Sequence, residues 1–263
     1  MVQGWGSNQF GKFGTLKGED NNQNVSQQQR CIPRRVESLK HVYCVKVAAG
    51  DRHSVALSRK GEVYCWGDNQ AGQLGTSPRS NNLGIGNNTS STSGGVLQAI
   101  RAYALWESEP KKIAIAISAS EQSTMVLTRP PQNNGKMLSK NTVYAWGYGN
   151  HIPIRVNFNS SNQDGSTLET SHTNPISIAC AKHHNVAVMS DGRVFTWGLH
   201  TDHLGHNKNN SKQKNSHRSS MILASPQLVT GMLPENGGGI AVAVSASDSH
   251  TAILTDCGHL YDE

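Results

Sequence analysis

One thirteen-residue pattern recurs four times along the chain, and this recurrence constrains the fold more than any other feature of the sequence. Each copy holds two short runs in which apolar residues alternate with polar or small ones, and a period of two predicts half-buried β-strands rather than a helix. The copies align without gaps at Val45–Leu57, Ile115–Leu127, Ile176–Val188 and Val242–Leu254. The chain is therefore predicted to be a series of similar antiparallel strand pairs.

A glycine turn and a Trp-Gly pair follow the repeated strands and predict a third strand in each copy. The segment from Val63 to Trp66 is rich in β-forming residues before Gly67 ends it. The turn glycines are Gly61, Gly192 and Gly258, and the Trp-Gly pairs are Trp5-Gly6, Trp66-Gly67, Trp146-Gly147 and Trp197-Gly198. We expect the four tryptophans to pack between the sheets as core.

A fourth strand is predicted at four proline-led segments, because proline lacks an N–H and fits an outer sheet edge. These segments are Pro33–Val36, Pro110–Ile113, Pro153–Val156 and Pro226–Val229. The alanine-bearing run Val96–Trp106 is open to a second interpretation, a short helix. One four-stranded sheet per repeat predicts an all-β fold, a β-propeller of four-stranded antiparallel blades with about four blades present.

The whole chain is predicted to be one repeat domain, residues 1–263. Its copies are placed at about 1–40, 41–113, 114–156, 175–229 and 240–263. Polar inserts rich in Asn, Ser and Gly stand at 77–95, 157–174 and 207–220, and they are predicted to be flexible loops because they bury little apolar surface.

Composition argues against several classes of protein. No window approaches the roughly 18 consecutive apolar residues of a membrane helix, and the N-terminus resembles no signal peptide, so no membrane partner is expected. Five scattered cysteines without a CxxC pair predict reduced thiols in an intracellular protein, with cytoplasm and nucleus not resolved. A net charge of +6 permits acidic partners. No enzyme motif appears, so neither catalytic residues nor a cofactor are expected.

Three motifs of the chain resemble the repeat of the regulator of chromosome condensation family. They are the Gly-x-x-His-Ser element of Gly50, His53 and Ser54, the Val-Tyr-x-Trp-Gly strand from Val63 to Gly67, and the turn Gly72-Gln73-Leu74-Gly75. The match covers about five partial or complete copies, essentially the whole chain apart from the polar inserts. The resemblance implies a seven-bladed propeller.

The sequence departs from the family pattern in the third and fourth copies. The departures are Ser120 and Ser123 in place of Gly and His, Tyr148-Gly149-Asn150 in place of the Gly-Gln-Leu-Gly turn, and the shortened turn Asp202-His203-Leu204-Gly205. Because only three central copies approach completeness, we expect a partial chain of a larger propeller. The alternative is four blades, the last one completed by the N-terminal strand.

Candidate partner-binding residues stand in the turn between the first two strands of each copy. They are Asp51, Arg52, Lys182, His183 and Asp248, with Glu121 nearby in the repeat frame. The family's founding member is a nucleotide exchange factor for the small GTPase Ran, and the resemblance implies that acidic and His side chains in such turns contact the GTPase. The alternative is that these are ordinary polar turn residues, since Asp caps local N–H groups.

Structural roles in the repeat are assigned to its recurring Gly, His and Trp residues. These are Gly50, His53, Trp66, Gly67, Trp146, Gly147, His184, Trp197, Gly198 and His250. The three histidines occur once per blade, too far apart in a ring for a common ion, so no metal is expected. Each is predicted to be a partly buried imidazole that is hydrogen-bonded to a neighbouring strand.

Three functional hypotheses follow. The preferred one is a non-catalytic β-propeller module that binds another protein through a loop-built face. The first alternative is guanine-nucleotide exchange on a small Ran-like GTPase. The second is chromatin or nucleic-acid contact through the basic run His206–Arg218, although that run lacks the interleaved aromatic residues typical of nucleic-acid sites. The oligomeric state and the identity of the partner stay open.

Overall fold

A computed structural model describes most of the chain outside its polar inserts. The described residues are 1–7, 9–14, 30–76, 96–102, 112–133, 136–137, 140–158, 173–198, 204–205, 225–232 and 239–262. Within them, helical structure is confined to the short 3₁₀ turns η1 (Gln9–Gly11), η3 (Glu37–Leu39) and η7 (Thr230–Met232). No helix in this part of the chain has the length and apolar character needed to cross a bilayer.

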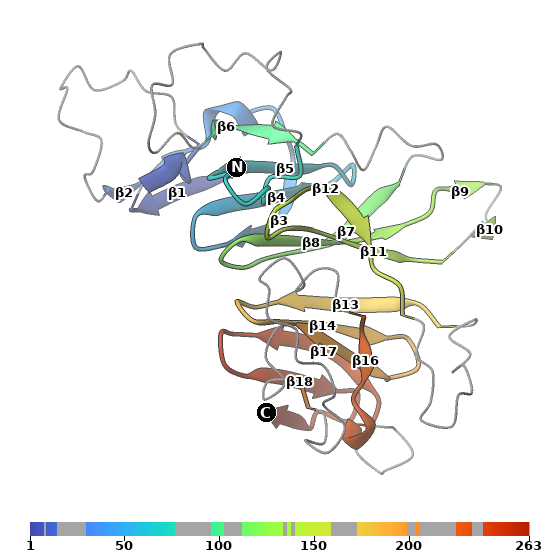
Figure 1. Ribbon diagram of the computed structural model, residues 1–263. Helices are drawn as coiled ribbons and strands as arrows, with labels where there is room; N and C mark the ends of the chain where they lie inside the picture. Colours follow the sequence, from blue (N-terminus) through green and yellow to red (C-terminus); the bar gives the residue numbers. More distant parts are fainter. Residues whose placement is uncertain are drawn as a thin grey trace, which may run out of the picture.

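Apart from one small ribbon, the described strands form five antiparallel sheets that follow one another in a row, with the first and the fifth at opposite ends (Figure 1). The first sheet is β1 (Gln3–Gly6) and β2 (Arg30–Arg35). The second is β3 (Cys44–Ala49), β4 (His53–Ser58), β5 (Val63–Gly67) and β6 (Val96–Arg101). The third is β7 (Ile113–Ala119), β8 (Ser123–Arg129), β11 (Thr142–Gly147) and β12 (Asn150–Arg155).

The last two sheets repeat the same order. The fourth is β13 (Pro175–Cys180), β14 (His184–Met189), β15 (Val194–Gly198) and β16 (Gln227–Leu228). The fifth is β17 (Ala241–Ala246), β18 (Thr251–Thr255) and β19 (Leu260–Asp262). The long hairpin of the third copy carries the small ribbon β9 (Gln132–Asn133) and β10 (Lys136–Met137).

Strand pairing confirms the predicted propeller blades. The aligned segments form the first and second strands of the second to fifth sheets, and the Trp-Gly segments form third strands. In the second, third and fourth sheets, the glycine of the Trp-Gly pair lies opposite the same position of the second strand, which gives the pairs His53–Gly67, Ser123–Gly147 and His184–Gly198. A shared register means that equivalent side chains face the same way in every blade.

The predicted fourth strand of the second copy is wrong. β6 fills that position through the pairs Tyr64–Arg101 and Cys65–Ile100, whereas Ile113 of the predicted segment Pro110–Ile113 begins β7. The helix interpretation of Val96–Trp106 fails over Val96–Arg101 for the same reason. The open edge of β5 needs backbone partners, and this pairing overrides local helix propensity.

The other proline-led segments lie at sheet edges, as predicted. Pro33 is within β2, Pro153 is within β12, and Pro226 directly precedes β16. Each of these strands is the last in its sheet. The missing proline N–H therefore removes no bond from a central strand.

Two of the predicted polar inserts, 77–95 and 207–220, lie outside the described residues. The third, 157–174, is described only at its ends, and these differ from a flexible loop. Phe158 makes edge-to-face contacts with Phe195 and Trp197, at centroid distances of 5.6 and 5.9 Å. Asn174 accepts a hydrogen bond from the backbone N–H of Asn141, so both ends of this segment are anchored on the core.

Three tryptophans pack between sheets, as predicted. Trp66, Trp146 and Trp197 are each 3% exposed or less, and each belongs to the apolar cluster that joins its own sheet to the preceding one. Trp5 contradicts the prediction, because its indole is 62% exposed. It lies on the first sheet of the row, where no preceding turn of the described chain covers it.

A backbone carbonyl of one sheet fixes the indole of the next. The Trp66 Nε1–H donates to the Lys12 carbonyl at 2.7 Å, and the Trp146 Nε1–H donates to the Gln73 carbonyl at 2.8 Å. Each carbonyl accepts a second bond from a hydroxyl of the same later sheet, Ser54 in one case and Thr124 in the other. Lys12 and Gln73 hold equivalent places in two glycine-bounded turns, so this junction is a repeated unit.

The junction between the third and fourth sheets lacks this carbonyl. Tyr148-Gly149-Asn150 leads directly into β12, so the third copy has no residue equivalent to Gln73. Two buried donors at the corresponding places, Trp197 Nε1–H and Asn185 Nδ2–H, have no hydrogen-bond partner among the described residues. A departure visible in the sequence therefore leaves two unsatisfied polar groups in the core.

Two of the repeat histidines behave as predicted. His53 Nε2 lies 2.8 Å from Thr124 Oγ1, and His184 Nε2 lies 2.7 Å from Thr251 Oγ1, each across a junction between sheets. Because the Thr124 hydroxyl donates to the Gln73 carbonyl, it accepts from His53. His250 differs from the prediction, since it is exposed and its Nδ1 bonds Ser247 of its own turn.

The alternative of four blades closed by the N-terminal strand is not supported. β1 pairs with β2 in antiparallel fashion, and the fifth sheet consists of β17, β18 and β19 among the described residues. The first and fifth sheets are separated by the whole row (Figure 1).

The junctions predict unequal costs for one substitution at two equivalent tryptophans. Trp146→Phe removes a satisfied buried hydrogen bond, worth about 1 kcal/mol or more, whereas Trp197→Phe removes a donor that is already unsatisfied. Both variants lose the same ring volume, so each controls for the other. We expect Trp146→Phe to lower the free energy of unfolding by about 1–3 kcal/mol more than Trp197→Phe does in urea titrations. Equal losses contradict this account.

Burial of His53 predicts an acid-dependent loss of stability. Desolvation lowers the pKa of His53 from 6.5 to about 4, so below pH 6.5 the unfolded chain binds a proton that the folded chain excludes. This group costs no stability above pH 6.5, and its cost grows to about 2 kcal/mol at pH 5. Urea unfolding of the wild type and His53→Gln at pH 7 and pH 5 measures it. A variant with the wild-type pH slope contradicts the assignment.

Candidate functional site

The turns between first and second strands lie along one edge of the row, at the left of Figure 1, and we call them the turn row. They carry the predicted partner-binding residues at two equivalent positions. The first position holds Asp51, Glu121, Lys182 and Asp248, and the second holds Arg52, Gln122, His183 and Ser249. The side chains are exposed or half-buried. The blades therefore bring together residues that are widely separated in the sequence.

In the second, third and fourth sheets, the glycine of the Trp-Gly pair positions the turn. A Cβ at Gly67, Gly147 or Gly198 would lie 2.0–2.5 Å from the carbonyl oxygen of the second turn residue. Gly67 and Gly147 also adopt positive φ angles of 109° and 107°, which L side chains rarely adopt. Gly50 permits a second close approach, because its Cβ would lie 2.2 Å from the Ser120 carbonyl.

Hydrogen bonds from the third strand hold the same turn carbonyls. The N–H of Asp68 donates to the Arg52 carbonyl at 2.9 Å, and the N–H of Tyr148 donates to the Gln122 carbonyl at 3.1 Å. The sheets therefore fix the turn backbone, while the turn side chains project from it. Rigid strands that present varied turns are the usual scaffold of a recognition surface.

Arg52 is held by three neighbours. Its guanidinium lies 3.8 Å from the Asp51 carboxylate, 3.9 Å from the buried Asp68 carboxylate, and 5.1 Å above the Phe10 ring. Lys12 Nζ donates to the Asp51 carbonyl at 2.9 Å. The Asp51 carboxylate itself is 64% exposed, so it keeps a solvent-facing negative charge beside a fixed cation.

Lys182 links two sheets within the turn row. Its Nζ lies 3.4 Å from the Glu121 carboxylate of the third sheet, and its carbonyl accepts the Tyr148 hydroxyl at 2.7 Å. Both charged side chains are partly exposed, so the ion pair adds little stability and instead fixes their relative place. Asp248, on the fifth sheet, is exposed.

Two of the three repeat histidines, His53 and His184, bond across junctions between sheets. His53 and His184 are fully buried and engaged by threonines, and His250 lies on the fifth sheet. Within the described part of the chain, no cluster of His, Cys, Asp or Glu has the arrangement of a metal site. Cys44, Cys65, Cys180 and Cys257 are free thiols.

Sequence reasoning missed the residues that support the turn row. Asp68 anchors Arg52, and Tyr148 ties the third sheet to the Lys182 backbone. Both residues directly follow a Trp-Gly pair. Their position in the repeat could therefore have predicted that they contact the turn row. The basic run His206–Arg218, with Lys208, Lys212, Lys214 and Arg218, lies outside the described residues.

Known proteins similar to this chain include much longer ones. It is 27% identical over 233 residues to the probable E3 ubiquitin-protein ligase HERC4 of Mus musculus, with 88% of this chain and 18% of HERC4 aligned. It is 24% identical over 266 residues to the E3 ubiquitin-protein ligase HERC2 of Homo sapiens, with 99% of this chain and 4% of HERC2 aligned. The chain therefore spans a small part of these relatives.

A solved structure shares the fold. Prp20p from Saccharomyces cerevisiae superposes with a TM-score of 0.66 at 19% identity, covering 98% of this chain and 52% of Prp20p. The alignment thus covers about half of Prp20p.

The motifs, the blades and a family model agree. The model of the regulator of chromosome condensation (RCC1) repeat matches residues 2–57, 60–127 and 191–254, and a second model of the same repeat matches residues 44–73. Together these matches span well over half of the sequence. The chain belongs to the regulator of chromosome condensation (RCC1) repeat family.

Proposed function

We propose that this chain is a non-catalytic protein-interaction module of the RCC1-repeat type, and that the turn row is its contact surface. The observation that carries the proposal is the fixed turn backbone, with varied charged side chains at equivalent places in four sheets. Similar regions occur within HERC4 and HERC2, where they span a minor part of the protein. The free thiols support an intracellular place of action.

Charge gives the turn row its specificity in this proposal. Asp51 and Asp248 stand at its two ends, and the Glu121–Lys182 pair lies between them. A partner with basic groups spaced to meet both acids would be favoured, because charge complementarity selects partners and raises the association rate.

Position-specific cross-linking tests the contact surface. A photo-crosslinking amino acid replaces Asp248 in the turn row or, as the control, the exposed Glu37 of η3. We expect a cross-linked protein from the native host at position 248 and not at position 37. Asp51→Lys, at the other end of the turn row, should weaken this cross-link at least several-fold, because it reverses a solvent-facing charge that the same partner is proposed to contact. Equal cross-linking at both positions contradicts the proposal.

A narrower proposal is that the partner is a small Ran-like GTPase, on which the chain acts as a nucleotide exchange factor. Asp51, Asp248 and His183 lie in the turn row, where the family resemblance expects such residues. The solved structure of Prp20p was reported with its binding to Gsp1p and histones, which supports a protein partner of this kind. The chain aligns with only 52% of Prp20p. The narrower proposal therefore includes the claim that this part alone holds a working GTPase site.

Nucleotide release tests the narrower proposal. A Ran-like GTPase loaded with a fluorescent GDP analogue should release it faster with the wild-type chain, and about ten-fold more slowly with Asp51→Ala than with the wild type. Glu37→Ala is the matched acidic control and should behave as wild type. Absence of acceleration, or acceleration that Asp51→Ala leaves unchanged, removes the exchange activity and leaves the interaction module to be judged by cross-linking.

A further inference from the structure

A cavity of about 230 Å³ lies between the third and fourth sheets. Its apolar lining includes Val156 and Phe158, which follow β12, and Met189, which ends β14. Its charged lining residues are Lys140 and Arg155, and no aspartate or glutamate is among the described residues that line it. The cavity therefore combines an apolar surface with positive charge.

The cavity lies away from the turn row. Thr142 begins β11 and Pro175 begins β13, and both residues line the cavity. The other ends of these two strands, Gly147 and Cys180, adjoin the turns of the turn row. A ligand in the cavity and a partner on the turn row would thus meet opposite ends of the same strands. An inference about the cavity therefore does not depend on the proposed function.

Arg155 differs from its equivalent in the second sheet, Arg101, in its lack of an acidic partner. Each of the two arginines lies opposite the tyrosine that stands two residues before the tryptophan of the third strand. Arg101 Nη2 lies 3.1 Å from Glu62 Oε1, whereas Thr142 stands at the place of Glu62 in the third sheet. Arg155 is exposed and makes no ion pair within the described residues. A ligand carboxylate beside Arg155 would supply the charge that Glu62 supplies to Arg101.

A neighbouring lysine adds to the positive charge at this edge of the third sheet. Lys112 Nζ lies 4.3 Å from the centre of the Tyr144 ring. Burial lowers the pKa of Lys112, and the charge of Arg155 lowers it further. Neither cation pairs with an aspartate or glutamate within the described part of the chain. An anion bound beside Arg155 would therefore relieve repulsion between the two cations.

A buried hydrogen-bond acceptor belongs to the same cavity. Asn141 lines it, and the Asn141 Nδ2 donates to the Pro175 carbonyl at 3.1 Å, which fixes the amide between the two sheets. The Asn141 Oδ1 is buried and has no hydrogen-bond partner among the described residues. A buried acceptor without a donor is costly, so a ligand that offers an N–H here is favoured.

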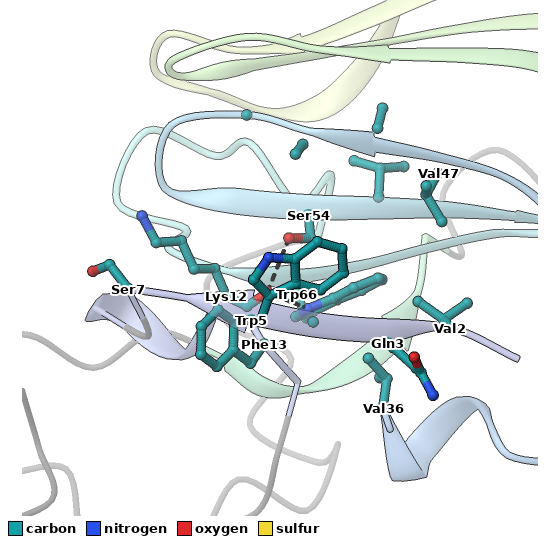
Figure 2. A pocket seen from close by; sticks show the side chains of 15 residues that line it. Val2, Gln3, Trp5, Ser7, Lys12, Phe13, Val36, Val47, Ser54 and Trp66 are labelled. Carbon is teal, nitrogen blue, oxygen red and sulfur yellow. Dashed lines mark hydrogen bonds between the residues drawn. The ribbon is translucent and has the colours of Figure 1, made fainter. Parts of the chain in front are cut away.

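The pocket between the first and second sheets differs, because its polar groups are engaged within the chain (Figure 2). Lys12 is the charged residue that lines this pocket, and its Nζ donates to the Asp51 carbonyl at 2.9 Å. Ser54 Oγ and Trp66 Nε1 both donate to the Lys12 carbonyl. The cavity between the third and fourth sheets instead offers a cation and an acceptor to a ligand.

We propose that this cavity binds the C-terminal residue of a partner protein, one with an apolar side chain. Its carboxylate would lie beside Arg155 and Lys140, its side chain would pack against Phe158 and Met189, and its N–H would donate to Asn141 Oδ1. The last residue of a chain offers these three groups together. The volume of about 230 Å³ suits one residue, since sites that enclose drug-sized ligands measure roughly 300–1,000 Å³.

N-acetyl-leucine is the probe for this proposal, because it carries the carboxylate, the apolar side chain and the N–H of a chain end. In amide NMR spectra of the full chain, we expect saturable shifts at Thr142 and Phe158 with a Kd of about 1 mM, as is typical of so small a ligand. N-acetyl-leucinamide lacks the carboxylate and should bind about ten-fold more weakly, and N-acetyl-N-methyl-leucine lacks the N–H and should bind about three-fold more weakly.

One pair of arginine variants assigns the carboxylate to its partner. Arg155→Gln should weaken binding of N-acetyl-leucine about ten-fold, because it removes a charged donor. Arg35→Gln is the matched control, since Arg35 is also exposed on the last strand of its sheet, and it should bind as wild type. The amide spectrum of each variant shows whether the fold is kept.

Several outcomes overturn the proposal. They are absence of saturable shifts up to about 20 mM N-acetyl-leucine, equal binding of the acid and its amide, and wild-type binding by Arg155→Gln. Acetate or inorganic phosphate that binds as tightly as N-acetyl-leucine also overturns it, because the cavity would then hold a bare anion and not a chain end.

Discussion

The first two junctions between blades depend on single backbone carbonyls that each accept two donors from the next sheet. Lys12 and Gln73 provide these carbonyls, an indole N–H and a hydroxyl provide the donors, and apolar clusters enclose the bonds. A bond buried in this way is costly to leave unmade, so it fixes the angle and spacing of neighbouring sheets more sharply than apolar contact does. Histidine adds a further bond at two junctions. The repeated Gly, His and Trp residues therefore act together to hold neighbouring sheets in place.

The junction between the third and fourth sheets lacks the carbonyl that accepts two donors. This junction has no carbonyl equivalent to that of Gln73, and other hydrogen bonds join the sheets. The Tyr148 hydroxyl donates to the Lys182 carbonyl, and the Cys180 N–H donates to Ser118 Oγ. Burial raises the pKa of the Cys180 thiol to about 11, so the thiol stays protonated beside Ser118. Met125, Leu127 and Ile178 pack with Trp197 in one apolar cluster at this junction, where the Trp197 Nε1–H and Asn185 Nδ2–H make no hydrogen bond within the described residues.

Periodicity and glycine spacing predicted most of the fold because both report local backbone geometry. Strand alternation, the Trp-Gly register and the edge prolines follow from residues that are close in sequence. The failures concern long-range choices. β6 joins β5 across a long insert, and nothing local distinguishes it from Pro110–Ile113. Trp5 carries the same motif as Trp66 yet is exposed, since burial of an indole depends on the neighbouring sheet and not on its own strand.

The candidate site also has one part that the sequence predicts and one part that it does not. Its backbone was predictable, because the glycine that ends each third strand also admits the turn carbonyl, and both recur with the repeat. Its chemistry was not predictable, because the side chains at the two outward positions of each turn differ from blade to blade. Acidic, basic and neutral residues occupy these positions, while the backbone hydrogen bond that closes the turn is kept in all four sheets. A surface whose side chains vary on a constant backbone can acquire a new partner without loss of stability. The residues of the junctions therefore show which family the chain belongs to, whereas the turn residues determine which partner it binds.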